Sequence, residues 1–215
     1  MGYDHHRMEK RPPRTALVLA ICAALGATGL TLGLAGVLSW DEPVPEMQTF
    51  RLPDAPEGEE AAWERVEEAW NRLPSLQVEV LRRRRPALGA LAAANVLASG
   101  ALLWGALAAR MRRRNGLSSL RTGLVLSQAW AVLATGVHVW VQLEVLSLQR
   151  PALQPLIEEG GSVAGMAQLA LAAQLAAVGI TAALTLGQLA FYIWAHVWSG
   201  RPAVREALAP IDPPA

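Results

Sequence analysis

Charged residues are missing from four long stretches of the sequence, and these gaps decide the class of protein. The uncharged stretches hold 26, 24, 22 and 41 residues and lie at 15–40, 86–109, 122–143 and 160–200. A bilayer core about 30 Å thick requires roughly 20 apolar residues, because an α-helix rises about 1.5 Å per residue. The helices of a soluble core would carry charged residues on their solvent face. The sequence therefore predicts an integral membrane protein with four membrane helices.

Cysteine and lysine are almost absent too. Cys22 is the only cysteine, so no intramolecular disulfide forms and the redox compartment is not indicated. Lipidation of Cys22 is not expected, because the bulky Ile21 precedes it and the apolar run before it is shorter than that of a signal peptide. Lys10 is the only lysine beside 18 arginines, and alanine and leucine are abundant. This bias is typical of a GC-rich bacterial genome, which predicts the inner membrane.

The groups that membrane enzymes and pumps use are scarce. No Asp, Glu, Lys or Arg lies near the middle of an expected membrane helix, whereas ion-coupled transporters and proton pumps usually place such groups there. The sequence has no H-E-x-x-H motif, no phosphate-binding glycine loop and no Ser–His–Asp or Cys–His set at one depth. We therefore expect no catalytic residues, no metal site and no cofactor, and we do not expect an enzyme.

Prolines and charged clusters divide the chain between the uncharged stretches. Pro12 and Pro13 stop any helix before the membrane, and Pro74 separates a loop helix at 59–73 from the residues that lead into Pro86. The expected parts are a tail at 1–14, membrane helices at 15–40, 86–109, 119–149 and 163–198, a loop at 41–85, a basic turn at 110–118, a loop at 150–162 and a tail at 199–215. The fourth membrane helix is one span rather than two, because its middle contains no proline and no polar cluster.

The expected helices differ in length. At about 1.5 Å per residue, the third and fourth would extend about 46 and 54 Å, beyond the bilayer core, so we expect them to form a hairpin that projects from one side of the membrane. The predicted fold is all-α: an antiparallel four-transmembrane-helix bundle with a small acidic helical cap in the first extracytoplasmic loop. Small residues in two steps, Gly29 with Gly33 and Gly179 with Ala183 and Gly187, predict close helix packing.

The arginine and lysine residues of the loops predict the orientation. With the N-terminus inside, the cytoplasmic parts hold 11 basic residues and the outer parts hold eight. Both termini are therefore expected in the cytoplasm, although the cluster Arg82–Arg85 lies on the opposite side. Trp40 is expected at the outer interface, and Arg112–Arg114 serve as a topology signal.

One apolar seam marks the loop helix at 59–73. Trp63, Val66, Trp70 and Leu73 recur at helical spacing, while four glutamates occupy the other faces. Three interpretations stay open for this seam: packing on the protein's own third and fourth helices, contact with another protein, and binding to anionic lipid. Self-packing is favoured, because the acidic faces would be repelled by anionic lipid.

The basic cluster before the second membrane helix has two interpretations. Arg82, Arg83, Arg84 and Arg85 stand in a row directly before Pro86. Their guanidinium groups match the oxygens of lipid phosphates. A solvated anchor, partly neutralised by the acidic loop, is the favoured interpretation.

A few uncharged polar side chains remain inside the membrane: Asn95, Gln128, His138, Thr181 and Gln188. By depth, Gln128 matches Gln188 and His138 matches Thr181, so each pair is placed to form an interhelical hydrogen bond worth about 0.6 kcal/mol. A continuous pore lined by such groups would instead favour a transporter. Haem ligation by His138 and His196 is not expected, because their depths differ by about 22 Å.

These features favour a non-enzymatic multi-pass membrane protein that serves as a subunit, scaffold or accessory component of a membrane assembly. A small transporter or channel component is the alternative, and a membrane redox protein is the third class. The expected partners are the lipid bilayer and another membrane protein. Nucleic acid is not expected, because the formal net charge is only +1.

Overall fold

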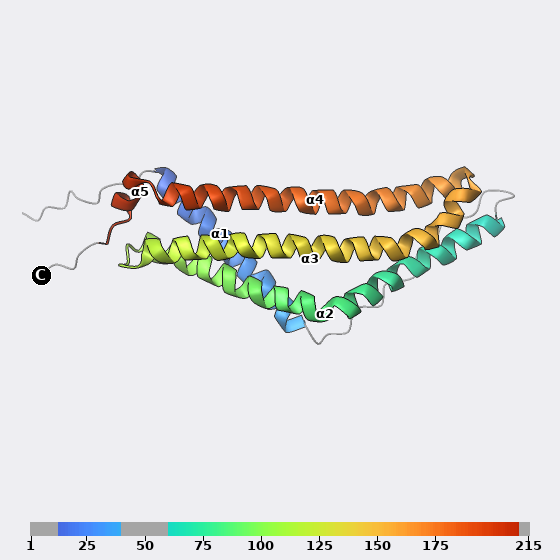
Figure 1. The fold of residues 1–215 in the computed structure, drawn as a ribbon, viewed down its shortest axis with the longest axis horizontal. Helices are drawn as coiled ribbons and strands as arrows, with labels where there is room; N and C mark the ends of the chain where they lie inside the picture. The colour runs from blue at the N-terminus through green and yellow to red at the C-terminus, as the bar shows by residue number, and fades with distance from the viewer. Residues whose placement is uncertain (1–12, 40–59, 211–215) are drawn as a thin grey trace, which may run out of the picture. The chain divides into compact units, whose positions relative to one another are not determined.

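The protein is all-helical in the part that a computed structural model describes, residues 13–39 and 60–210. The helices are α1 (Pro13–Leu38), α2 (Glu60–Arg110), α3 (Gly116–Glu159), α4 (Gly161–Ser199) and α5 (Pro202–Ala207) (Figure 1). The first four are each long and apolar enough to cross a membrane, which confirms the number of such helices that the charge gaps predict. Trp40, most of the N-terminal tail, the loop segment 41–59 and residues 211–215 lie outside the described residues.

Helix α2 corrects the expected division at Pro74 and Pro86. It continues through both prolines for 51 residues, so the loop helix at 59–73 and the membrane helix at 86–109 are one element. A proline inside a helix costs about 3 kcal/mol, because it removes a hydrogen bond and collides with the preceding turn. Packing on both sides of Pro74 offsets this cost: Val66 before it and Val80 after it are both buried.

Helix α3 likewise continues past the end expected at Gln149. It passes through Pro151 and Pro155 to Glu159, and the buried Leu153 and Leu156 hold the added turns. The expected loop at 150–162 is therefore reduced to a sharp turn at Gly160. Gly160 and Gly161 have φ angles of 80° and 71°, a left-handed conformation that only glycine adopts at little cost.

The helices fall into two compact units, which are described separately. The first unit contains α1, residues 90–133 and residues 186–210. Its core joins the start of α1 to the end of α2, the start of α3 and the end of α4; representative members are Leu19, Cys22, Ala109, Leu120 and Ala195. Within this unit, consecutive long helices therefore run in opposite directions.

Glycines set the spacing of the helices in the first unit. A Cβ added to Gly33 of α1 would lie 3.0 Å from the backbone nitrogen of Val96 in α2. A Cβ on Gly105 of α2 would lie 2.6 Å from backbone atoms of Leu120 in α3, and one on Gly123 of α3 would lie 2.7 Å from the Cα of Leu102. The crossing expected from Gly29 and Gly33 is confirmed, since both face α2.

A left-handed cap ends α2 at the basic turn. The N–H of Arg113 donates to Ala108 O (3.0 Å) and that of Arg112 to Ala109 O (3.1 Å). Arg112 has a φ of 52°. This pair of hydrogen bonds is the Schellman motif, in which glycine usually takes the left-handed position. The chain thus reverses within a few residues, and α3 starts at Gly116.

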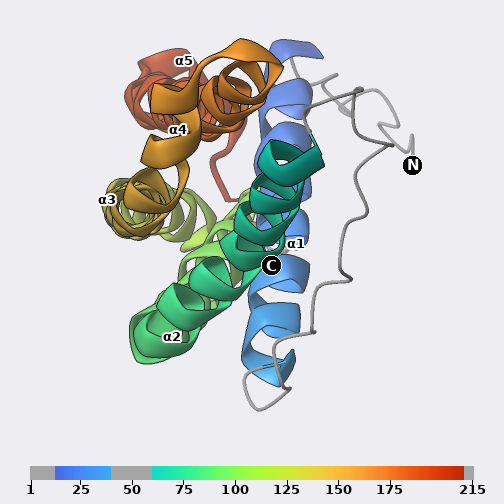
Figure 2. The ribbon, with the colours of Figure 1, turned by 90° about the vertical axis from the view of Figure 1, so that its right-hand side faces the viewer.

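The second unit contains residues 60–89 and 134–185. One of its clusters gathers Val66 with residues from the end of α3 and the start of α4, and the other gathers Val80 with Val141 and Val145 of α3. In Figure 2 the start of α2 and the turn between α3 and α4 face the viewer. The unit is held by apolar contacts among α2, α3 and α4 and by ion pairs of Arg83 and Arg84 of α2 with Glu144 of α3.

Candidate functional site

The seam on α2 lies against α3 and α4. Val66 is only 1% exposed and belongs to a cluster with Leu153, Leu156, Val163 and Ala167. Trp63 and Leu73 are partly buried against the same cluster. Contacts within the protein therefore occupy the part of the seam that surrounds Val66.

Trp70 and Leu73 are the members of the seam that line a groove. Both are half-buried, and the open-sided groove has a volume of about 410 Å³. Leu169 also lines the groove and is 70% exposed, so this edge of the groove is apolar and accessible. A ligand or partner in the groove would reach Trp70 and Leu73.

The arginine cluster is tied to α3 by Glu144. Arg84 Nε donates to Glu144 Oε2 at 2.7 Å, and Arg83 donates to Glu144 Oε1 at 3.4 Å. The Arg84 guanidinium also lies 3.9 Å from the ring centroid of Trp140, a favourable cation–π contact. Arg83 donates to Glu79 of its own helix as well. These two arginines thus serve contacts within the protein, which weakens the lipid-phosphate interpretation for them.

The other two arginines of the cluster differ in exposure. Arg82 is exposed and Arg85 is half-buried. Sequence reasoning missed Glu144, because it treated this residue only as the end of an uncharged stretch. The pairing depends on the register of α2 against α3, which no local pattern encodes.

Asn95 connects two helices of the first unit. Its side-chain nitrogen donates to the carbonyl oxygen of Gly29 at 3.0 Å, and its oxygen accepts from Ser99 at 2.9 Å. The small residue at Gly29 brings the α1 carbonyl within reach. Asn95 thus links α2 to α1 by a hydrogen bond.

The expected pair of Gln128 and Gln188 is replaced by a different arrangement. Gln188 donates to the Tyr192 hydroxyl of its own helix at 2.7 Å. Ser127 of α3 also shares a hydrogen bond with that hydroxyl. The link between α3 and α4 thus runs through Tyr192, which is buried in the core of the first unit. Tyr192 lies one helical turn beyond Gln188. It was not counted among the polar groups of the sequence because its side chain is mostly an aromatic ring.

His138 and Thr181 each bond to their own helix rather than to one another. His138 Nδ1 lies 2.7 Å from Ala134 O, and the Thr181 hydroxyl donates to Ala177 O at 2.9 Å. A side chain whose hydrogen bond goes to a carbonyl oxygen in the preceding turn of its own helix does not link that helix to another. Among the described residues, no group of three or more His, Cys, Asp and Glu side chains is placed to hold a metal ion.

Helix α4 leaves most of its surface uncovered. Between Ala167 and Tyr192 none of its residues is buried. Leu184 is 71% exposed, and a Cβ at Gly179 or Gly187 would have no atom within 4 Å. The close packing expected on this glycine ridge is therefore not made by any residue in the described ranges 13–39 and 60–210.

A pocket with both apolar and basic lining residues lies in the first unit where α3 begins and α4 ends. It is open-sided, has a volume of about 660 Å³ and is lined by residues of α3, α4 and α5. Arg121, His196 and Arg205 supply its basic groups. Sequence reasoning did not group them, because 75 residues separate Arg121 from His196 along the chain.

Comparisons with known proteins identify no relative. No protein-family model, no curated protein and no solved structure matches this chain.

Proposed function

We propose that the chain is a non-enzymatic multi-pass membrane protein that acts as a subunit or accessory component of a membrane assembly. Four helices suited to cross a membrane support the first half of this proposal. The polar side chains Asn95, Thr181 and Gln188 bond to backbone or to neighbouring side chains, an arrangement that supports a structural role.

The exposed face of α4 supports the second part of the proposal, that the protein is a subunit or accessory component of a membrane assembly. In the first unit, glycines bring neighbouring helices into backbone contact. Gly179 and Gly187 offer the same close approach on α4, but a Cβ at either position would have no atom of the described residues within 4 Å. Lipid tails solvate exposed leucine side chains as well as a protein surface does. Small residues instead favour contact with another helix, because helix association in membranes depends on close backbone packing. The partner is therefore a helix of another membrane protein.

Photo-crosslinking tests this assignment. A photoreactive amino acid at Leu184 of α4 should form an adduct with another membrane protein in intact membranes. The same probe at Leu32 of α1 is the matched control, since these leucines are 71% and 65% exposed. The control should give only lipid adducts. If Leu184 also gives only lipid adducts, α4 does not contact a partner and the assignment fails.

We further propose that the protein lies in a bacterial inner membrane with both termini in the cytoplasm. The basic residues of the tails and around the α2–α3 turn outnumber those of segments 41–85 and 150–162 by 11 to eight, and arginine and lysine favour the cytoplasmic side. The first unit supports a common side for the two tails, because its core joins the start of α1 to the end of α4.

Reporter fusion and cysteine labelling test the orientation. A reporter fused after Ala215 should behave as cytoplasmic. In a Cys22→Ala background, a cysteine introduced at Gln48 should react with an impermeant reagent in intact cells, because no other thiol remains. Labelling that occurs only after permeabilisation would reverse the orientation.

A further inference from the structure

The pocket between α3, α4 and α5 contains polar hydrogen-bonding atoms without a partner. Arg121 Nε and His196 Nδ1 are both buried and accept or donate no hydrogen bond within the described residues. A guanidinium N–H is always a donor, because arginine stays protonated. Native proteins rarely leave such buried groups unsatisfied. The Arg121 side chain lines the pocket, so an acceptor in the pocket can bind its guanidinium group.

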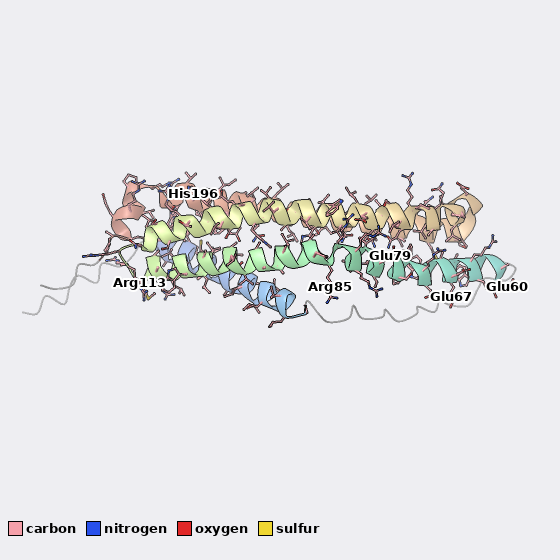
Figure 3. The ribbon with its side chains drawn as sticks, turned by 60° about the horizontal axis from the view of Figure 1, so that its bottom comes forward. Glu60, Glu67, Glu79, Arg85, Arg113 and His196 are labelled. Atoms are coloured by element: carbon pink, nitrogen blue, oxygen red, sulfur yellow. The ribbon has the colours of Figure 1, made fainter. Side chains whose placement is uncertain are left out.

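The charge of the pocket selects the kind of acceptor. Arg205 of α5 adds a second guanidinium, and the hydroxyl groups of Ser118 and Thr122 add further donors. Glu206, the neighbour of Arg205, is exposed and does not line the pocket. Phosphate oxygens fit this set well, because guanidinium groups form paired, charge-assisted hydrogen bonds to them. Figure 3 shows His196 near the end of α4, at the same end of the first unit as Arg113.

The apolar side of the pocket selects the molecule that carries the phosphate. Val125 and Leu126 of α3 line the pocket and are 49% and 43% exposed. Val125 lies about 6 Å further along the helix than Arg121, on the side of the uncharged stretch 122–143. A phosphate at Arg121 would thus be followed by hydrocarbon at Val125. A phospholipid has this order of groups, with the phosphate at the surface and the acyl chains below it.

We propose that this pocket binds the phosphate group of a membrane phospholipid, with Arg121 and Arg205 on the phosphate oxygens and an acyl chain along Val125 and Leu126. The site is separate from the Arg82–Arg85 cluster of the second unit. It does not depend on the partner proposed for α4. A soluble phosphate compound offers the same oxygens, so the experiment must separate the two sources.

Native mass spectrometry of the detergent-purified protein tests this proposal. The probes are phosphatidylglycerol and a diacylglycerol with the same acyl chains and no phosphate. Phosphatidylglycerol should bind in a saturable manner and more tightly than diacylglycerol. Arg121→Gln should weaken its binding about tenfold or more, and Arg205→Gln should weaken it severalfold, as expected when charge-assisted hydrogen bonds are lost. Arg114→Gln, which removes an exposed charge from the turn before α3, is the matched control and should leave binding within about twofold.

Three outcomes would overturn the proposal. Equal binding of diacylglycerol and phosphatidylglycerol would show that the phosphate is not recognised. If Arg114→Gln and Arg121→Gln weaken the binding of phosphatidylglycerol equally, the lipid responds only to the net charge of the protein and not to this pocket. Displacement of the lipid by millimolar inorganic phosphate would assign the pocket to a soluble phosphate. If Arg121→Gln fails to fold, the exposed Arg205→Gln decides the question, and Arg121→Lys separates the guanidinium from its charge.

Discussion

Replacement of Gly123 by alanine is expected to destabilise the purified protein by about 1–3 kcal/mol, the usual cost of overpacking. The added Cβ would lie 2.7 Å from the Cα of Leu102 and from the carbonyl oxygen of Ala101. Both are backbone atoms, so no side-chain rotation relieves the collision and α2 and α3 must move apart. Gly105→Ala should act in the same way, because its Cβ would lie 2.6 Å from backbone atoms of Leu120.

Gly136→Ala is the matched control for this experiment. It lies on the same helix as Gly123, and its Cβ would have no atom within 4 Å. Alanine in a helix interior is more favourable than glycine by about 0.5–1 kcal/mol, so this variant should be as stable as the parent or slightly more stable. Thermal unfolding in one detergent compares the variants. Equal melting temperatures for Gly123→Ala and Gly136→Ala would contradict the close crossing of α2 and α3.

Val66→Asp is expected to cost on the order of 3 kcal/mol or more, because it buries a carboxylate without a partner in an apolar cluster. Val66 is 1% exposed and packs on residues of α3 and α4. Thermal unfolding should shift to lower temperature, and trypsin should cleave faster at the exposed Arg72. Trp70→Ala should have a smaller effect, since Trp70 is only half-buried.

Glu64→Gln provides the control for the seam, because Glu64 is exposed on the same helix. It should leave both the melting temperature and the rate of proteolysis unchanged. A Val66→Asp variant as stable as the parent would show that the seam does not pack on α3 and α4. Loss of a co-purifying protein without loss of stability would assign the seam to a partner instead.

The number of long helices could be predicted because a membrane imposes a length on every apolar stretch. The four gaps between charged residues correspond to α1, to the second half of α2, and to parts of α3 and α4. The close packing at Gly29 and Gly33 could also be predicted, because small residues at helical spacing lie on one face of a single helix. Both patterns are local, and each follows from the nearest few turns of the chain.

The ends of the helices could not be predicted, because they depend on contacts between distant residues. Pro74 has an unfavourable local effect, yet α2 continues because Val66 and Val80 are packed on either side of it. The ion pairs of Glu144 with Arg83 and Arg84 join residues about 60 positions apart. The pocket at Arg121 likewise draws its basic groups from three helices. Register between helices decides all three features, and a single sequence does not encode register in a readable pattern.

The reciprocal glycines of α2 and α3 have a consequence for the order of assembly. Gly105 and Leu120 are 15 residues apart, and Leu102 and Gly123 are 21 residues apart. The core cluster that contains both Cys22 and Tyr192, by contrast, joins residues 170 positions apart. Contacts between residues that are near in sequence require little loop closure and form first. We therefore expect the α2–α3 hairpin to form before α1 and the end of α4 pack against it, so that its tight turn sets the alignment of these later contacts.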